Sequence, residues 1–382
     1  MTTAPPVLDV DALLDDPGTR IIVCCGSGGV GKTTTAAALG VRAAERGRDA
    51  VVLTVDPARR LAQSMGLSEL DNNPRRIEVG GDGELHAMML DMKRTFDEIV
   101  EAHSDPERAR QILANPFYQS LSSSLSGTQE YMAMEKLGQL HRSGAWDLII
   151  VDTPPSRNAL DFLDAPERMG RFLDGRFMKI LAAPAKSGGR LGVKVISAGF
   201  GMFTGVINKV LGVQLLRDVQ TFVAAFDTMF GGFRERAEKT YRLLQTPGTA
   251  FLVVAAPEPD ALREASYFVE RLAQEGMPLA GLVVNRVHEC EPSLSAARAQ
   301  AAAENLEERG EHPLTSALLR MHTDRMQLAA REERLRARFT SAHPNVPVTA
   351  VPAQAEDVHD LEGLRRVGED LSLGAAPAEP AA

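Results

Sequence analysis

The feature of this sequence that most constrains its fold is a glycine-rich segment near the N-terminus. Residues 26–33 read Gly-Ser-Gly-Gly-Val-Gly-Lys-Thr, which fits the pattern G-x-x-x-x-G-K-[ST]. A short apolar run at residues 21–25 precedes the segment, and an alanine-rich helical pattern follows it as far as Gly47. A strand, a phosphate-binding loop and a helix in this order begin a βαβ unit. The motif therefore predicts an α/β fold with a site for nucleotide phosphates.

Each part of this loop has a chemical role. The glycines let backbone N–H groups point into a concave nest around phosphates. Lys32 is expected to bring its charge to the β- and γ-phosphates, and Thr33 to offer its hydroxyl to Mg²⁺. The following helix directs its positive end at the same anion. The residues expected to bind the phosphates are Gly26, Ser27, Gly28, Gly29, Val30, Gly31, Lys32, Thr33 and Thr34.

Two acidic residues follow predicted strands close to this loop. The apolar run at residues 50–55 stops at Asp56, and the run at residues 148–151 stops at Asp152. In a doubly wound sheet both carboxylates lie at the edge that carries the ligand. We expect Asp152 to hold the Mg²⁺ shell and Asp56 to position or deprotonate the attacking water. The alternative at both positions is an ordinary turn carboxylate, and position alone does not decide the matter at Asp56.

Apolar runs and helical patterns alternate along the rest of the chain. Further strands are predicted at residues 85–90, 251–255, 282–284 and 346–351. Two helices are predicted within residues 293–341, and the charge-rich second one has the pattern of a solvated face. This alternation is typical of a doubly wound, mostly parallel sheet that helices cover on both faces.

The spacing of the predicted strands also indicates the domain organisation. Residues 92–145 and 157–248 are too long for simple crossovers, so we expect them to form a helical subdomain. The subdomain would be inserted into a single domain that spans residues 19–372. Residues 1–18 are expected to be a flexible leader, and residues 373–382 a disordered tail.

Composition excludes several classes of protein. The net charge is 42 − 51 = −9 and only 5% of residues are aromatic, which argues against nucleic-acid binding. Three cysteines exclude a four-cysteine zinc site within one chain, and no zinc is expected. The longest apolar stretch, residues 195–208, is shorter than the ~18–20 residues that a spanning helix needs. These features predict a soluble, cytoplasmic protein, and a peripheral position at the membrane stays open.

Five segments together point to a known family. They read GSGGVGKTTT, TVDPARRLAQSMG, VDTPPSRNALDFL, VVNRV and VTAVPAQAEDVHDLEGL. With these motifs the chain resembles the ArsA family of P-loop ATPases from about residue 20 to residue 371, and the actinobacterial members in particular. The family includes arsenite-pump ATPases and the ATPases that target tail-anchored membrane proteins. It shares a deviant phosphate loop with the nitrogenase iron protein, MinD and ParA.

The resemblance implies a Mg²⁺-dependent ATPase in which ATP closes a dimer and hydrolysis opens it, so that the dimer handles a membrane-related client. It makes Asp56 the switch I carboxylate, and residues 152–156 the switch II segment that reports the γ-phosphate. It also implies that Asn285 hydrogen-bonds adenine and that Pro352 begins the adenine-side loop. The helical inserts correspond to the client-binding subdomain. Whether the apolar and basic segment at residues 171–210 is a client groove or internal packing stays open.

The sequence departs from the family at the second position of the loop. The family has a lysine there that reaches the partner's phosphates across the dimer, whereas this chain has Ser27, which is neutral and short. One of Arg59, Arg60 and Arg157 would have to replace that lysine, or a related subunit would have to bring it. We favour the second explanation, a heterodimer with a paralogous ArsA-like subunit. In addition, DPARR stands where the family has DPAH, which leaves the coupling of switch I open.

Missing cysteines narrow the chemistry further. The zinc-binding C-x-x-C of the targeting ATPases is absent, and so are the thiolates that As(III) prefers, because no cysteine lies between Cys25 and Cys290. Three functions remain. The first is an ATP-driven switch for a membrane-related client, the second an ATPase subunit that energises an anion efflux pump, and the third a nucleotide-binding scaffold with low turnover.

Overall fold

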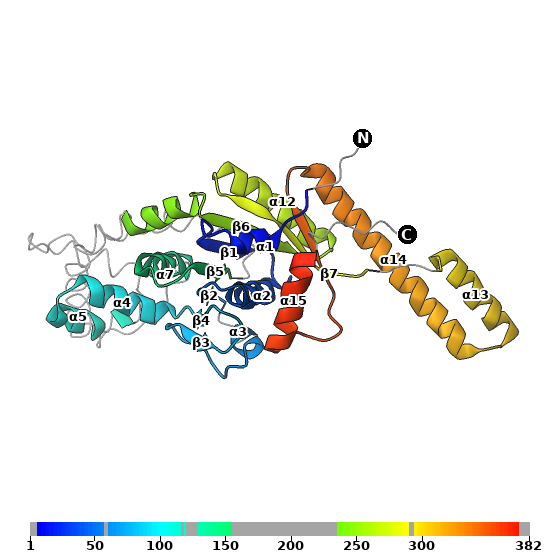
Figure 1. The fold of residues 1–382 in the computed structure, drawn as a ribbon, viewed down its shortest axis with the longest axis horizontal. Helices are drawn as coiled ribbons and strands as arrows, with labels where there is room; N and C mark the ends of the chain where they lie inside the picture. The colour runs from blue at the N-terminus through cyan, green and yellow to red at the C-terminus, as the bar shows by residue number, and fades with distance from the viewer. Residues whose placement is uncertain are drawn as a thin grey trace, which may run out of the picture. The chain divides into compact units, whose positions relative to one another are not determined.

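The sheet expected from the sequence is the centre of the structure. The structure, a computed structural model, describes residues 6–56, 60–115, 118–119, 129–154, 235–289 and 294–373. Eight strands form one sheet in the order β3-β4-β2-β5-β1-β6-β7-β8. Every neighbouring pair is parallel except β3 and β4, so the doubly wound, mostly parallel α/β fold is confirmed (Figure 1). The strands are β1 (Ile21–Cys25), β2 (Ala50–Thr54), β3 (Arg75–Ile77), β4 (Leu85–Met89), β5 (Leu148–Asp152), β6 (Thr249–Ala255), β7 (Leu279–Val287) and β8 (Val348–Pro352).

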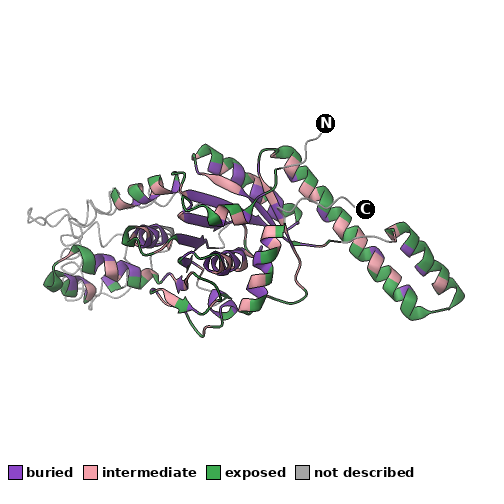
Figure 2. Ribbon diagram, in the orientation of Figure 1, coloured by how far each residue is buried: buried purple, intermediate pink, exposed green. Residues whose placement is uncertain are grey.

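The central strands are apolar along their whole length because helices cover both faces of the sheet. Every residue of β1, β2, β5 and β6 is buried, as expected for continuous apolar runs in parallel strands (Figure 2). The register places Asp152 beside Cys24 of β1 and beside Thr54 of β2. Strand β5 therefore ends between β1, which leads into the phosphate loop, and β2, which ends near Asp56.

Seven described helices belong to the same compact unit as the sheet. The phosphate-loop helix begins at Lys32, directly after Gly31, and ends just before Gly47, whose φ of +86° suits a glycine. One wide face of this helix is buried, which is why its sequence is rich in alanine. The helices are α1 (Val10–Asp15), α2 (Lys32–Glu45), α3 (Arg60–Ser64), α12 (Pro259–Gln274), α13 (Ala296–Arg309), α14 (Pro313–Ala342) and α15 (Leu361–Leu373).

The N-terminal segment differs from the expected flexible leader. From Leu8 to Asp16 it is packed: Leu8, Val10 and Leu14 are buried, and Leu8 N–H donates to Val348 O of β8. Sequence analysis missed this because a six-residue helix produces little periodicity, and because its anchoring charges pair with residues far along the chain. Residues 1–5 and 374–382 lie outside the described part, so the expected tail is untested.

A second compact unit comprises residues 90–138 and 161–241. Its described part is helical and contains α4 (Met92–His103), α5 (Pro106–Leu113), most of α7 (Gln129–Ser143) and the helical residues 235–241. Partly buried ion pairs join these helices: Lys136 Nζ lies 2.9 Å from Glu98, and Arg236 Nε lies 3.0 Å from Glu135. Residues 155–234, which include the apolar and basic segment, lie outside the described residues, so the subdomain boundaries stay a prediction.

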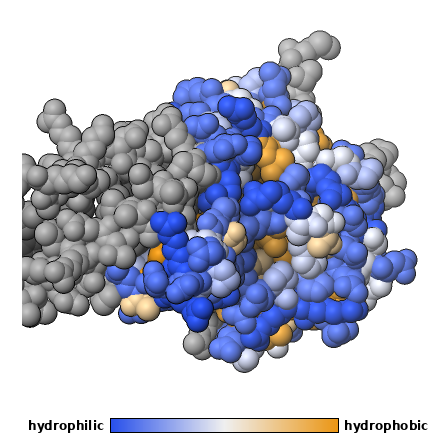
Figure 3. Space-filling view, turned by 90° about the vertical axis from the view of Figure 1, so that its left-hand side faces the viewer, coloured by the Kyte–Doolittle hydropathy of each residue, from blue (hydrophilic) through white to orange (hydrophobic). Residues whose placement is uncertain are grey.

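The described surface carries few apolar groups in the view of Figure 3. Hydrophobic residues show there only as small separate areas among hydrophilic ones, so this face offers no broad apolar patch within the described part. No helix among the described residues combines the length and the apolar character that crossing a bilayer requires.

Candidate active site

The backbone of the phosphate loop needs glycine at two positions above all. Gly26 has a φ of +148°, and a Cβ atom there would lie 2.1 Å from Val254 O. Gly31 has a φ of +96°, and a Cβ atom there would lie 2.1 Å from Asn285 Nδ2. Any larger residue at either position would push the loop away from the neighbouring strand. The loop is thus fixed against β6 and β7 by close contacts that side chains would prevent.

Lys32 points back into the loop from the first turn of α2. Its side chain is buried, and Nζ donates a hydrogen bond to Ser27 O at 2.8 Å. Burial lowers the pKa of Lys32, while the nearby Asp152 carboxylate acts in the opposite direction. The loop therefore holds an ammonium group among its own backbone groups, at the place where the sequence predicts phosphates.

Asp152 is the most deeply buried charge of the site, with no exposed surface. Its Oδ2 accepts hydrogen bonds from Thr33 Oγ1 at 2.7 Å and from Thr54 Oγ1 at 2.9 Å. Its Oδ1 is buried and has no hydrogen-bond partner among the described residues. Burial raises the pKa of Asp152 to about 6, although both threonine hydrogen bonds and the Lys32 charge favour the ionised form. The structure thus brings Lys32, Thr33 and Asp152 together as predicted.

Thr54 was missed by sequence analysis. It ends β2 and faces Asp152 across the sheet, so its hydroxyl orients the carboxylate that Thr33 also contacts. The sequence did hold a signal, because Thr54 is the polar residue at the end of an apolar strand two positions before Asp56. The register between β2 and β5 was needed to recognise it.

The donor set fits a magnesium ion. A hydroxyl and a carboxylate with a spare oxygen are the ligands that this hard cation prefers, and Mg²⁺ usually keeps several waters as well. The unpartnered Oδ1 of Asp152 gives a buried oxygen that a water of such a shell would satisfy. Thr33 would contribute its hydroxyl, because Asp152 already accepts the proton.

Asp56 lies two residues beyond Thr54, at the same end of the sheet. It is half-buried, and its N–H donates to Thr54 Oγ1 at 3.2 Å. Its negative charge reaches both Lys32 and Asp152, since it opposes the effect of burial on the pKa of Lys32 and adds to it on the pKa of Asp152. Residues 57–59 of the same segment lie outside the described part, and Arg60 is exposed at the start of α3.

Asn285 contacts the phosphate loop itself. Its Nδ2 donates to Val30 O at 2.9 Å, and its Oδ1 accepts from Arg286 N–H at 3.0 Å. Arg286 has a φ of +63°, and the pairing of β7 with β8 shifts between Asn285 and Val287, so that Val287 pairs with Pro352. The structure therefore brings Asn285 to the loop and Pro352 to the neighbouring strand end. The adenine contact expected of both stays a prediction.

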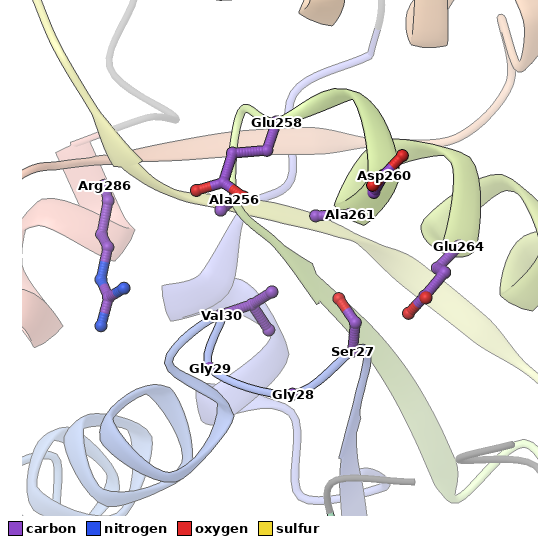
Figure 4. Close-up of a pocket in the computed structure, with 10 residues that line it drawn as sticks. All are labelled: Ser27, Gly28, Gly29, Val30, Ala256, Glu258, Asp260, Ala261, Glu264 and Arg286. Carbon is purple, nitrogen blue, oxygen red and sulfur yellow. The ribbon is translucent and has the colours of Figure 1, made fainter. Parts of the chain in front are cut away.

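Ser27 lines an open pocket of about 380 Å³ between the loop and α12. Three carboxylates and one guanidinium group line this pocket with the loop, and Figure 4 shows Glu264 pointing toward Ser27 and Arg286 on the opposite side. Asp260 pairs with Arg263 at 2.7 Å. The other two carboxylates have no ion pair with a described residue. The charged residues of the pocket are Glu258, Asp260, Glu264 and Arg286.

The two cysteines before the loop are packed side chains. Cys24 and Cys25 are buried in β1, and burial raises the pKa of both thiols, that of Cys25 to about 12. Both therefore stay protonated near neutral pH and are poor nucleophiles or metal ligands. Cys290 lies outside the described residues.

Comparison with known proteins agrees with this site. The sequence model of the anion-transporting ATPase (ArsA) family matches residues 19–311, which contain the loop, both acidic residues and Asn285. The chain is 30% identical to the ATPase GET3 of Malassezia globosa over 169 residues, which cover 44% of this chain and 48% of that protein.

Two further relatives match more of the chain. It is 25% identical to the ATPase GET3 of Podospora anserina over 280 residues, 73% of this chain and 76% of that protein. It is also 26% identical to an Aquifex aeolicus protein named as an arsenical pump-driving ATPase. The 277 aligned residues are 70% of this chain and 63% of that protein. The chain thus spans between about half and three quarters of these relatives. On the family match, this chain belongs to the ArsA family of anion-transporting ATPases.

Proposed function

We propose that this chain binds Mg²⁺–ATP in the phosphate loop and hydrolyses it to ADP and phosphate, as one half of a dimer that opens and closes. The observation that carries the proposal is the cluster of Lys32, Thr33 and Asp152, in which a buried carboxylate oxygen has no partner within the described part of the chain. A buried, unsatisfied oxygen beside a loop shaped for phosphates is costly unless a ligand shell completes it.

Each residue has a defined task in this proposal. Lys32 leaves the Ser27 carbonyl and binds the β- and γ-phosphates, while Thr33 and Asp152 hold the Mg²⁺ shell. The ion, when bound, neutralises charge on the phosphate oxygens. Asp56 orients the attacking water and accepts its proton, since it lies at the same strand edge and its field reaches Lys32. Asn285 and Pro352 are assigned to the adenine side.

The partner in the proposed dimer is a related ArsA-like subunit that supplies the missing lysine. Two features support this. Ser27 brings no cation of its own, and the pocket beside it contains Glu258 and Glu264 without ion-pair partners among the described residues. A lysine that enters this pocket from outside meets opposite charge before it reaches the phosphates.

The proposed task is the handling of a membrane-related client from the cytoplasm, with the chain peripheral at the membrane. The support is the family's pump-driving and protein-targeting members. The segment that would contact a client, residues 171–210, lies outside the described residues.

A second candidate is an ATPase subunit that energises an anion efflux pump. It is favoured by the similarity to the arsenical pump-driving ATPase of Aquifex aeolicus. It predicts that phosphate release rises when a specific oxyanion is added, whereas the client switch predicts no such rise.

The partner proposal and the third alternative, a low-turnover scaffold, are separated by restoring the charge at position 27. We expect the isolated wild-type chain to release phosphate slowly, and Ser27→Lys to raise the rate at least about tenfold, because a finger cation contributes ~10³–10⁵ in related enzymes. Phosphate release under saturating Mg²⁺–ATP measures this.

Ser27→Met is the matched control, because it adds a chain of similar length without charge and is expected to stay at the wild-type rate. Lys32→Ala, which removes the loop's own cation, should abolish the rate in every background. Rapid turnover by the wild-type monomer, or equal rates for the Lys and Met variants, would refute the need for a partner's cation.

A further inference from the structure

Helix α14 has one face that packs on α13. Ser316 and Thr323 lie on this face and are buried. Ser316 Oγ donates to Ala303 O at 3.2 Å, and Thr323 Oγ1 lies 3.4 Å from Ala296 O. The two helices therefore form an antiparallel hairpin that is closed by small polar residues (Figure 1). This face of α14 is therefore covered by α13.

The opposite face of α14 carries an exposed apolar stripe. It consists of Leu314, Leu318, Met321 and Leu328, which are 73%, 52%, 63% and 40% exposed. At 100° per residue all four lie within one narrow sector, on the side of the helix away from Ser316 and Thr323. They are four of the seven large hydrophobic side chains that are exposed in the described part of the chain, so their gathering on one helix face is not scattered surface exposure.

The same face is a packing surface farther along the helix. Glu332 and Phe339 continue the stripe and are 5% and 4% exposed. Glu332 accepts the N–H of His288 at 2.8 Å, and α14 also packs against α12. The C-terminal half of this face is therefore covered by the nucleotide-binding unit, while no described residue covers the N-terminal half.

Basic side chains flank the uncovered half. Arg325 interrupts the stripe between Met321 and Leu328, and Arg331 and Arg334 line a shallow hollow of about 560 Å³ that Leu328 shares. None of these three arginines has an ion pair with a described residue. The other residues of the hollow are Asp324, Gln327 and Ala330. Arg320 and Arg336 of the same helix, by contrast, are paired with Glu307 and Glu333.

We propose that the stripe, together with Arg325 and Arg331, binds an amphipathic helix with acidic flanks from a different protein. The stripe residues and Arg325 follow one another along α14 at intervals of four, three, four and three residues. This is the spacing of a coiled-coil seam, so the surface fits a second helix. Arg325 lies on the seam and Arg331 beside it, and their guanidinium groups need carboxylates on the incoming helix. The inference is independent of the proposed ATPase cycle, because it involves none of the residues of the active site.

Two other occupants fit less well. In a self-paired α14, the seam of each copy would bring Arg325 and Arg331, while Asp324 is the one acidic residue of the hollow, so the cations would outnumber the anions. A lipid surface suits a broad apolar face with aromatic residues, whereas this stripe is narrow and carries none. Charge and spacing therefore favour an acidic helix.

The test uses the full-length chain and two synthetic helical peptides of about four heptads. Both carry leucine at the a and d positions; one has glutamate at e and g, and the other has lysine there. We expect the glutamate peptide to bind in fluorescence anisotropy, with an affinity that falls as salt is raised. The lysine peptide should bind at least about tenfold more weakly.

Matched variants locate the binding. Leu318→Ser with Met321→Ser, and separately Arg325→Glu with Arg331→Glu, should each weaken binding of the glutamate peptide at least about tenfold. Arg298→Glu with Arg309→Glu makes the same charge change on α13 and should leave its affinity unchanged. All of these side chains are exposed, so thermal unfolding and the Mg²⁺–ATP response should stay at wild-type values.

Four results would overturn the proposal. They are equal binding of both peptides, unchanged binding by the stripe variant, a dimer in light scattering that the stripe variant converts to monomer, and flotation with phosphatidylserine vesicles that the stripe variant loses. The third result would identify a second copy as the occupant, and the fourth a membrane.

Discussion

At the scale of single residues, the site depends on Asp152, a carboxylate with no exposed surface. Asp152 has two hydroxyl donors on one oxygen, and no described residue donates to the other. Burial outweighs these donors and the Lys32 charge, and so raises its pKa to about 6. The ionised form is therefore costly in the absence of a cation, and binding of Mg²⁺ relieves that cost.

Replacing Asp152 by Asn should test this cost. In the wild type, the folded state holds its proton up to a higher pH than the unfolded state, so stability falls as pH rises from about 4 to about 6. Without Mg²⁺, the free energy of unfolding of Asp152→Asn relative to that of the wild type should increase by about 1–1.5 kcal/mol when the pH is raised from about 5 to about 8. Urea unfolding at both pH values measures this.

The same variant should lose Mg²⁺-dependent phosphate release. Thr54→Val serves as a comparison, because it removes one donor to the carboxylate and should raise the pKa of Asp152 further. A stability difference between Asp152→Asn and wild type that is constant across this pH range would contradict the account.

The sequence allowed some of these residues to be predicted and not others. Lys32, Thr33 and Asp152 could be named as neighbours because a motif fixes the first two and a strand end fixes the third, while their roles stay predictions. The contacts of Thr54 with Asp152 and of Asn285 with Val30 depend on register across the sheet, and a single sequence does not specify register.

At the scale of elements, the short helix α1 shows how a weak sequence signal becomes a fixed element. Asp9 caps it by accepting the N–H of Ala12 at 2.9 Å. Asp11 then accepts two hydrogen bonds from Arg42 of α2, at 2.5 and 2.6 Å, and one from Ser372 of α15 at 2.9 Å. Three helices distant in sequence thus meet at one carboxylate.

Asp11→Asn should destabilise this junction by about 1–2 kcal/mol, because the bidentate pair with Arg42 is partly buried. Hydrogen bonding from Arg42 lowers the pKa of Asp11, so its contribution is complete above the unfolded pKa and is lost as pH falls through the folded one. The effect should therefore shrink below about pH 4. Thermal unfolding at neutral and acidic pH measures both statements.

Asp15→Asn is the matched control on the same helix. Asp15 pairs with Arg46 but is about half exposed, so its loss should cost less than about 0.5 kcal/mol. Equal losses in the two variants would mean that the α1 junction is not held by the Asp11–Arg42 pair.

Strands were easier to predict than short elements. Seven of the eight strands match apolar runs, since burial on both faces demands continuous hydrophobic residues. The missing strand, β3, is three residues long and contains two arginines, and it pairs only with β4 at the edge of the sheet. Neither its length nor its composition resembles a buried strand.

At the scale of the whole molecule, the fold separates into two compact units, and every described residue of the site belongs to the one with the sheet. Binding of Mg²⁺–ATP should stabilise that unit by about 2.7 kcal/mol at a ligand concentration of 100 times Kd. This corresponds to a rise of a few degrees in its unfolding midpoint.

Removal of Mg²⁺ with a chelator should abolish most of this rise, and so should Asp152→Asn, whereas Arg298→Glu on α13 should leave it intact. Differential scanning fluorimetry with and without Mg²⁺ checks the result. An identical rise without the metal would mean that Thr33 and Asp152 hold no ion.

The partner subunit stays a proposal that rests on the sequence. The absence of a lysine at position 27 is visible there, and we propose that a second molecule supplies the missing cation. The same holds for the stripe on α14, where periodicity predicted a solvated helix and the structure leaves apolar residues on the outer face.

The hydrogen bond from Lys32 to the main chain of the loop has a consequence for how such loops diversify. Its acceptor is the main-chain oxygen of residue 27, so the contact forms whatever side chain that residue carries. The loop can keep this contact while the side chain of residue 27 is exchanged. After a gene duplication, one copy can thus lose or regain the charged side chain at position 27 by a single substitution. Two copies that were once identical can then come to depend on each other while both keep the same fold.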